Sequence, residues 1–233
     1  MARSGFVRLS VIIPVRNEEA CIARTLAAAG PELRDGDELI VADGRSTDRT
    51  ADVAREHGAR VLTCEPGRGR QMNEAAELAS GDVLLFVHAD TELPAGYRGD
   101  IEASLRGDDV CWGRFDITFD EGGRLLRLIA WLISTRSRIF RSATGDQAIF
   151  VRRSDFEAAG GYREQHLFED VDLARRLRRR GRMAIPRGRA VTSSRRWRNR
   201  GVWATTARMW TLKTLYLCGV PAGRLGRFYP DER

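Results

Sequence analysis

The stretch Gly-Asp-Val-Leu-Leu-Phe-Val-His-Ala-Asp-Thr-Glu-Leu-Pro, residues 81–94, decides the fold class. Its five consecutive apolar residues, 83–87, predict a parallel strand that is buried on both faces. The carboxyl end of that strand delivers His88 and Asp90 into a loop, and ligands of open α/β sheets bind at such ends. Because oxygen ligands suit Mg²⁺ and Mn²⁺, these two residues are candidate metal ligands. Alternatively, Asp90 only caps a helix that begins near Pro94.

Length and composition predict a folded α/β protein. A chain of 233 residues can form one domain with a substantial core, and we favour a single domain over residues 1–233. The 42% hydrophobic and 30% charged content argues against disorder over most of the length. The four cysteines lack CxxC spacing, which argues against a zinc site and fits a reducing compartment. With no signal peptide and no long apolar segment, we expect a cytoplasmic protein.

Charge differs strongly between the two halves of the sequence. Residues 1–110 carry a net charge of −7, whereas residues 111–233 carry +14. The basic half should face an anionic partner, either phospholipid, a phosphorylated acceptor or nucleic acid. A genomic bias towards arginine is the alternative explanation, since Lys213 is the single lysine of the chain.

Strand and helix patterns alternate four times in the first half of the chain. We expect strands at 7–14, 38–42, 59–63 and 83–87, and helices at 17–29, 51–57 and 71–79, with a turn-rich loop at 65–70. This order predicts right-handed crossovers and a doubly wound, mostly parallel sheet.

The second half of the chain departs from this alternation. We expect strands at 111–119, 147–151, 183–185 and 190–193, and helices at 124–140, 154–159, 171–180 and 202–217. Because no linker separates the halves, we expect them to share one sheet. The helix at 124–140 is amphipathic and too polar to span a bilayer. It either packs Leu125, Leu128 and Leu132 against the sheet or lies on an anionic membrane, which would make the protein peripheral on the inner membrane face.

The loop after the second expected strand contains further polar residues. Asp43 follows the strand directly, and Ser46, Thr47 and Asp48 can cap the next helix. A carboxylate at this position can accept a hydrogen bond from a nucleobase N–H or a ribose hydroxyl. The alternative is a capping loop without a ligand. The sequence contains neither GxGxxG nor GxxxxGK[ST], which argues against a dinucleotide-binding fold and a P-loop.

Three segments together resemble the family 2 glycosyltransferases of the GT-A fold. They are Ile-Ile-Pro-Val-Arg-Asn-Glu (12–18), Val-Ala-Asp-Gly-Arg-Ser-Thr-Asp-Arg-Thr (41–50) and His-Ala-Asp (88–90), and the resemblance continues through Gly-Asp-Gln (145–147) and Phe-Glu-Asp-Val-Asp-Leu (168–173). The chain looks most like a short bacterial subgroup associated with radical-SAM/selenodomain proteins and arsenosugar biosynthesis. The resemblance implies a GT-A fold in which residues 1–110 bind a nucleotide-sugar and residues 111–233 form an acceptor-side extension with the catalytic residues.

The resemblance also implies roles for individual residues. The binding site for a UDP- or GDP-sugar would include Pro14, Glu18, Asp43, Arg68 or Arg70, His88, Arg196 and Trp197. Asp90 would hold Mn²⁺ or Mg²⁺ on the diphosphate. His88 stands where the family usually has the first Asp of its DxD motif. This difference removes one negative charge and favours Mn²⁺ over Mg²⁺.

The pair Glu169-Asp170 is similar to the ED motif of the family, in which the aspartate is the general base. A carboxylate at a helix N-terminus can take the proton of an acceptor hydroxyl. Alternatively, both residues only supply negative charge to the first turn of an Arg-rich helix. His166 lies four residues before Asp170 and is either a further metal candidate or a surface residue.

The segment Arg195-Arg196-Trp197 is similar to the QxxRW motif of processive family members. Ser193 occupies the position of the glutamine, which argues against polymer synthesis. The expected function is therefore a metal-dependent, inverting transfer of one sugar from a nucleotide-sugar to a small or lipid-linked acceptor.

Two other functions fit parts of the sequence. A nucleotidyltransferase would require a Gly-rich basic loop after the first strand, where this chain has Pro-Val-Arg-Asn-Glu, residues 14–18. An Arg-rich nucleic-acid-binding module is favoured by the arginines of residues 175–180, but the acidic strand-end loops oppose it. We therefore do not expect nucleic acid as a partner.

Overall fold

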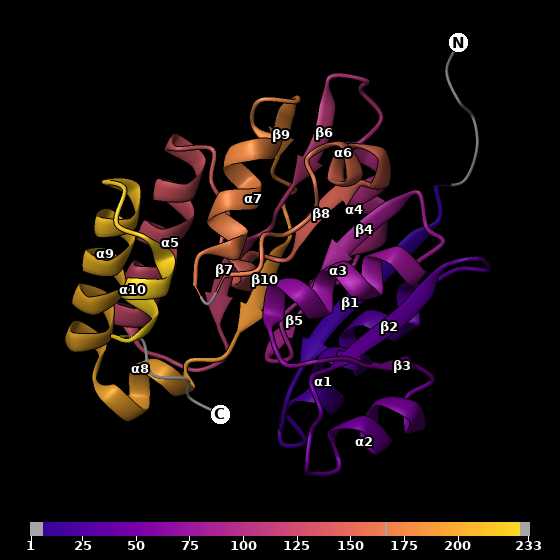
Figure 1. Ribbon diagram of the computed structural model, residues 1–233, viewed down its shortest axis with the longest axis horizontal. Helices are drawn as coiled ribbons and strands as arrows, with labels where there is room; N and C mark the ends of the chain where they lie inside the picture. Colours follow the sequence, from indigo (N-terminus) through magenta and orange to yellow (C-terminus); the bar gives the residue numbers. More distant parts are fainter. Residues whose placement is uncertain (1–6, 166, 229–233) are drawn as a thin grey trace.

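A seven-stranded sheet forms the centre of the structure, a computed structural model that describes residues 7–165 and 167–228 (Figure 1). In spatial order the strands are β3 (Arg60–Thr63), β2 (Glu38–Asp43), β1 (Leu9–Val15), β4 (Val83–Phe86), β8 (Ile149–Arg152), β6 (Val110–Gly113) and β9 (Arg182–Ala184). Strand β8 runs antiparallel to both of its neighbours, and all other pairs are parallel. The predicted mostly parallel α/β sheet is therefore confirmed, and strands from both halves of the chain contribute to it.

Helices cover both faces of this sheet. They are α1 (Ile22–Ala29), the short 3₁₀ helix η1 (Gly30–Glu32), α2 (Thr50–Glu56), α3 (Arg68–Leu78), α4 (Tyr97–Ser104), α6 (Arg153–Ala158) and α7 (Glu169–Leu177). Alternating side chains of β1 explain the two layers. Val11 and Ile13 pack in one core cluster with Leu26 of α1, whereas Ile12 packs in a second cluster with Met72 of α3. This is the layering of a doubly wound fold.

A second, three-stranded sheet supports the C-terminal part of the chain. Its order is β5 (Thr91–Glu92), β10 (Arg189–Thr192) and β7 (Asp116–Phe119). Beside it lie α5 (Arg124–Ile139), α8 (Arg195–Arg200), α9 (Val202–Leu217) and α10 (Ala222–Gly226), with α5, α9 and α10 together at the left of Figure 1. Ile117, Ile129 and Trp197 join β7, α5 and α8 in one buried cluster. Within the described ranges, no helix has the length and apolar character needed to cross a bilayer.

The prediction that a helix begins at Asn17 is wrong, because α1 begins at Ile22. Asn17 has a left-handed backbone with φ of 53°, and its amide donates a hydrogen bond to Oγ of Ser46 instead of starting a helix. The polar residues after β1 therefore connect two loops rather than cap a helix.

Other elements also differ from the prediction, and the clearest differences are at three places. The predicted strand 111–119 is two strands in different sheets, because the chain leaves the large sheet at Arg114, whose buried guanidinium pairs with Asp116. The predicted loop 65–70 ends early, since α3 already begins at Arg68. The helix expected near Pro94 begins at Tyr97, and Thr91–Glu92 forms a strand before it.

Candidate active site

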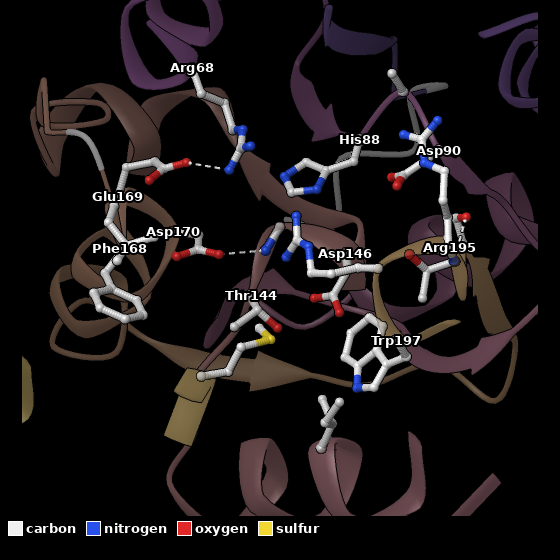
Figure 2. Close-up of a pocket in the computed structure, with 18 of the residues that line it drawn as sticks. Arg68, His88, Asp90, Thr144, Asp146, Phe168, Glu169, Asp170, Arg195 and Trp197 are labelled. Atoms are coloured by element: carbon white, nitrogen blue, oxygen red, sulfur yellow. Dashed lines mark hydrogen bonds and ion pairs between the residues drawn. The ribbon is translucent and has the colours of Figure 1, made fainter. Parts of the chain in front are cut away.

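A cavity of about 190 Å³ lies where the carboxyl ends of β1 and β4 face α7 and α8 (Figure 2). It brings together most of the residues that the sequence selected, namely Pro14, Glu18, Arg68, His88, Asp90, Glu169, Asp170, Arg196 and Trp197. Asp43 and Arg70 do not line it. Residues 14 and 197 are far apart in the chain, so the fold rather than local sequence assembles this cavity.

Hydrogen bonds between the first two βα loops hold Glu18 at the cavity. The amide of Glu18 donates to Oγ1 of Thr50 at 2.8 Å, and the amide of Thr47 donates to Oδ1 of Asn17 at 2.8 Å. Asp43 stabilises the same turn from behind, because its carboxylate accepts hydrogen bonds from the amide and the hydroxyl of Ser46. The side chains that resemble the family motif at 41–50 thus position the loop that carries Glu18.

Carboxylates concentrate around Asp90. Burial and the negative charge of Glu18 raise the pKa of Asp90, whereas the positive charges of Arg196 and Arg195 lower it. Arg195 also lies 3.6 Å from Glu18. The carboxylate of Asp146 acts on Asp90 in the same sense as that of Glu18, and its buried Oδ1 has no hydrogen-bond partner.

This concentration of oxygen ligands fits a hard divalent cation, because bound positive charge would offset the repulsion among the carboxylates. Within residues 7–165 and 167–228, no group of three or more His, Cys, Asp or Glu side chains is placed to hold a metal ion. A cation at Asp90 would therefore need further ligands from water or from the phosphates of a bound substrate. His166, the other metal candidate, lies outside the described residues.

The imidazole of His88 packs against the backbone of Gly145. A Cβ atom added to Gly145 would lie only 1.9 Å from Nε2 of His88, so any other residue here would have to displace the imidazole or η2. Gly145 begins the 3₁₀ helix η2 (Gly145–Gln147), which precedes β8. The contact joins the loop after β4 to the second half of the chain.

Asp170 lies in the first turn of α7, directly opposite η2. The amide of Gly145 donates a 2.5 Å hydrogen bond to Oδ2 of Asp170 (Figure 2). Burial and the neighbouring charge of Glu169 raise the pKa of Asp170 to about 7, whereas the positive charge of Lys213 and the hydrogen bond from Gly145 lower it. A carboxylate with such a pKa can accept a proton near neutral pH.

Glu169 has a structural partner. Its carboxylate is buried and lies 3.2 Å from the guanidinium of Arg68 (Figure 2). The sequence offered Arg68 or Arg70 as the arginine that contacts the nucleotide-sugar. Arg68 lines the cavity and Arg70 does not, because Arg70 pairs with Glu74 of α3. Glu169 thus positions the start of α7 and contributes negative charge next to Asp170.

Trp197 lies mainly in the core. Its side chain is 6% exposed, and its ring centroid lies 4.6 Å from that of Phe119. Only part of the indole reaches the cavity, whereas Arg196 lines it from the same helix.

Several charged residues at or near the cavity were not selected from the sequence, among them Arg16 and Arg195 on its wall. Arg136 of α5 and Asp146 of η2 line the cavity, and Lys213 of α9 acts electrostatically on Asp170. Asp146 lies in the Gly-Asp-Gln segment that resembles the family but was given no role, whereas Arg136 and Lys213 belong to no local motif. Lys213 did offer one signal, because it is the single lysine in an Arg-rich chain.

Comparison with known proteins decides the family. The sequence model of Glycosyl transferase family 2 matches residues 10–167. The chain belongs to this family. The match includes β1, the loops around Glu18 and Asp90, and η2.

Individual relatives agree with this family assignment. The chain is 39% identical over 97 residues to glucosyl-3-phosphoglycerate synthase of Mycobacterium tuberculosis, covering 37% of this chain and 30% of the relative. It is 30% identical over 196 residues to the probable glycosyltransferase YdaM of Bacillus subtilis, covering 73% of this chain and 46% of the relative. The chain thus matches less than half the length of either curated relative.

Solved structures confirm the GT-A fold. The crystal structure of the M. tuberculosis synthase with Mn²⁺, UDP and phosphoglyceric acid has a TM-score of 0.62 at 25% identity, covering 94% of this chain and 81% of that one. S. aureus TarS, residues 1–349, has a TM-score of 0.66 at 19% identity, covering 80% of this chain and 60% of that one.

Proposed function

We propose that the protein is a metal-dependent, inverting glycosyltransferase that moves one sugar from a nucleotide-sugar to a small or lipid-linked acceptor. The observation that carries this proposal is the placement of Asp170 in the same cavity as Glu18 and Asp90, with its carboxylate held by the amide of Gly145. In this proposal residues 1–233 act as one domain. Residues 1–110 bind the donor, and residues 111–233 supply the base and the acceptor side.

The proposed reaction is a single displacement in which Asp170 is the general base. The acceptor hydroxyl oxygen bonds to the anomeric carbon as the bond from that carbon to the diphosphate oxygen breaks. The hydroxyl proton passes to Asp170, and the nucleoside diphosphate leaves with the electron pair of the broken bond. No side chain becomes covalently attached, so the configuration at the anomeric carbon inverts. Glu169 raises the pKa of Asp170 and thereby increases its basicity.

Donor binding falls to the residues around the ends of β1 and β4. Glu18 and Pro14 line the side of the cavity that we assign to the nucleoside, and Asp43 remains a proposed contact of the base. Arg196 and Arg68 contribute positive charge on the cavity wall for the diphosphate.

A divalent cation would be held by Asp90, with His88 as a second proposed ligand, and would offset the charge of the leaving diphosphate. The Mn²⁺ and UDP of the synthase complex support this assignment by similarity. The imidazole of His88 in place of a second carboxylate favours Mn²⁺ over Mg²⁺.

The alternatives are weaker on structural grounds. The loop after β1 is hydrogen bonded to the loop after β2 through Asn17 and does not form a Gly-rich phosphate cradle. In the Arg-rich segment around α7, Arg176 pairs with Asp172 and Arg180 pairs with Asp155. These arginines stabilise the fold instead of presenting a continuous nucleic-acid surface.

Peripheral membrane contact forms part of the proposal. Among the described residues, nine of the ten exposed large hydrophobic side chains lie between positions 128 and 228, and they include Trp131 and Trp203. Helix α5 buries Ile129 and Ile133 but leaves Leu128 49% exposed, so packing against the sheet does not account for its whole apolar surface. An apolar surface within the basic half of the chain fits the surface of an anionic bilayer.

The experiment that tests the proposed function is a thermal-shift screen of UDP-, GDP- and dTDP-sugars with Mn²⁺, with Mg²⁺ and without metal. A true donor raises the melting temperature by mass action, and we expect the rise to require metal. The Asp90→Ala variant should fold normally but lose the metal-dependent part of the rise. If no nucleotide-sugar stabilises the wild-type protein with any metal, the proposed function is wrong.

A further inference from the structure

A second cavity adjoins the candidate active site. It has a volume of about 320 Å³ and lies between α5, α7 and α9. Arg136 and Trp210 line both cavities. Five cationic side chains line the second cavity, Arg136, Arg141, Arg175, Arg178 and Lys213, and in the part of the chain that the structure describes no Asp or Glu lines it.

Lys213 is the most unusual of these residues. Its side chain is only 8% exposed, and its Nζ has no hydrogen-bond partner. Nε of Arg136 is buried without a partner as well. Asp170 and Asp146 act on Lys213 electrostatically, but neither forms a hydrogen bond with it. A buried ammonium group without a partner is costly, so it marks a place where a ligand can supply the missing bonds.

The electrostatic effects on Lys213 agree with this view. Burial and the positive charge of Arg136 lower the pKa of Lys213 to about 8. An anion between the two groups would offset their repulsion and accept hydrogen bonds from both. Guanidinium and ammonium groups together are the usual protein ligands of phosphate.

We propose that this second cavity binds a phosphate group of the acceptor substrate. Because Arg136 and Trp210 line both cavities, a molecule held here by its phosphate can extend a hydroxyl group towards Asp170. The assignment of the phosphate to the acceptor rests on the proposed glycosyl transfer, whereas the anion site itself does not.

The rim of the cavity indicates what the phosphate is attached to. Phe140 is 63% exposed and Leu217 is 65% exposed, and both line the cavity together with Trp210. The acyl chain of a lipid phosphate that also carries a hydroxyl group would cover these side chains, whereas a soluble phosphate ester would not. A lipid phosphate and a soluble phosphate ester both carry the phosphate group, and the apolar rim favours the lipid phosphate as the acceptor.

Calorimetry with defined probes tests this proposal. Farnesyl phosphate, glycerol 1-phosphate and uncharged farnesol would be titrated into the wild-type protein and into the Lys213→Met and Arg175→Gln variants. The Arg179→Gln variant is the matched control, because Arg179 follows α7 and is exposed but does not line the cavity. We expect phosphate binding to weaken about tenfold or more in Lys213→Met, to weaken in Arg175→Gln and to stay unchanged in Arg179→Gln.

The results also distinguish the two sources of phosphate. Much tighter binding of farnesyl phosphate than of glycerol 1-phosphate identifies a lipid phosphate, and equal binding identifies a soluble ester. The anion site is wrong if neither phosphate binds, if farnesol binds as tightly as farnesyl phosphate, or if Lys213→Met binds phosphate like the wild type. Binding of UDP in the presence of Mn²⁺ is measured in parallel. If UDP does not bind, this result counts against the proposed function and not against the anion site.

Discussion

The backbone amide of Gly145 donates a 2.5 Å hydrogen bond to the carboxylate of Asp170, and the same glycine packs against the imidazole of His88. One residue thus touches the proposed base and a proposed metal ligand, which come from opposite halves of the chain. The position of η2 therefore couples the donor side of the cavity to its acceptor side.

Substitution of Gly145 tests this coupling. The Cβ atom of Gly145→Ala would clash with His88, which must displace either the imidazole or η2. Because a displacement of about 1 Å can cost about 10²-fold in rate, we expect a fall in transfer rate of that order. Gly99→Ala is the control, since a Cβ at Gly99 in α4 meets no atom within 4 Å. Equal activity of both variants would show that the His88 contact has no functional role.

The pH dependence of transfer tests the environment of Asp170. Because a base must be ionised, the rate should rise with pH and level off above a pKa of about 7. Lys213→Met removes a positive charge that lowers this pKa, so the rise should move to higher pH. Glu169→Gln removes a negative charge that raises it, so the rise should move to lower pH. If the pH–rate profile is unchanged in both variants, the ionisation of Asp170 does not control the rate of transfer.

The same shift of pKa affects stability. Because the pKa of Asp170 is higher in the folded protein than its ordinary value of 3.8, the folded state holds the proton more tightly than the unfolded chain does. The stabilisation from this proton is present at low pH and is lost as pH rises through about 7. Denaturant unfolding of the wild type and of Asp170→Asn at several pH values would measure this contribution.

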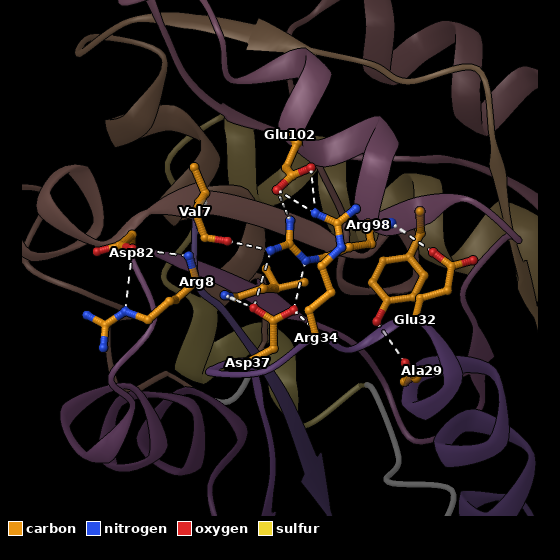
Figure 3. A network of polar contacts seen from close by, with 11 residues as sticks. Val7, Arg8, Ala29, Glu32, Arg34, Asp37, Asp82, Arg98 and Glu102 are labelled. Atoms are coloured by element: carbon orange, nitrogen blue, oxygen red, sulfur yellow. Dashed lines mark hydrogen bonds and ion pairs between the residues drawn. The ribbon is translucent and has the colours of Figure 1, made fainter. Parts of the chain in front are cut away.

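A buried ion pair far from the site provides a prediction for stability (Figure 3). Arg98 of α4 contacts Asp37 at 2.8 Å, and both side chains are under 5% exposed. Arg98→Met would leave the carboxylate of Asp37 without its buried partner, so we expect a loss of about 3–5 kcal/mol in the free energy of unfolding. Arg8→Gln is the control, because Arg8 and Asp82 are both about half exposed and their pair should contribute under about 1 kcal/mol. If denaturant unfolding shows similar losses of unfolding free energy for Arg98→Met and Arg8→Gln, burial does not make the first ion pair more stabilising than the second.

Liposome co-sedimentation tests the proposed membrane contact. At low salt the wild-type protein should bind anionic vesicles more strongly than neutral ones, because each arginine near an anionic surface contributes about 1 kcal/mol. Trp131→Ser and Trp203→Ser should weaken this binding. Leu78→Ser is the matched control, since Leu78 is the exposed large apolar residue on α3, away from α5 and α9. No difference between the two kinds of vesicle would contradict a membrane surface.

Local sequence was sufficient for much of the fold. Helix α5 has the periodic apolar pattern of an amphipathic helix, and the buried strands β1, β2 and β4 are short apolar runs; all four lie close to their predicted positions. The break within residues 111–119 could not be predicted in this way. It depends on the buried pair of Arg114 and Asp116, and the alternation of side chains gives no sign that a chain moves from one sheet to another.

The site shows the same limit. Residues in sequential motifs, such as Glu18, Asp90 and Asp170, could be selected because their spacing resembles that of a known family. Arg136 and Lys213 could not, because only the packing of α5 and α9 beside α7 brings their charges near Asp170. Short helices such as α8 and α10 also escaped prediction, since a few residues carry no clear periodicity.

The most direct test of the central claim compares the Asp170→Asn variant with the wild type in donor binding and in sugar transfer. The amide keeps the size of the carboxylate but cannot take the acceptor proton. We predict that nucleotide-sugar binding with Mn²⁺ is retained while transfer falls by about 10² to 10⁴-fold. Loss of donor affinity with preserved turnover would contradict the role of Asp170 as the general base.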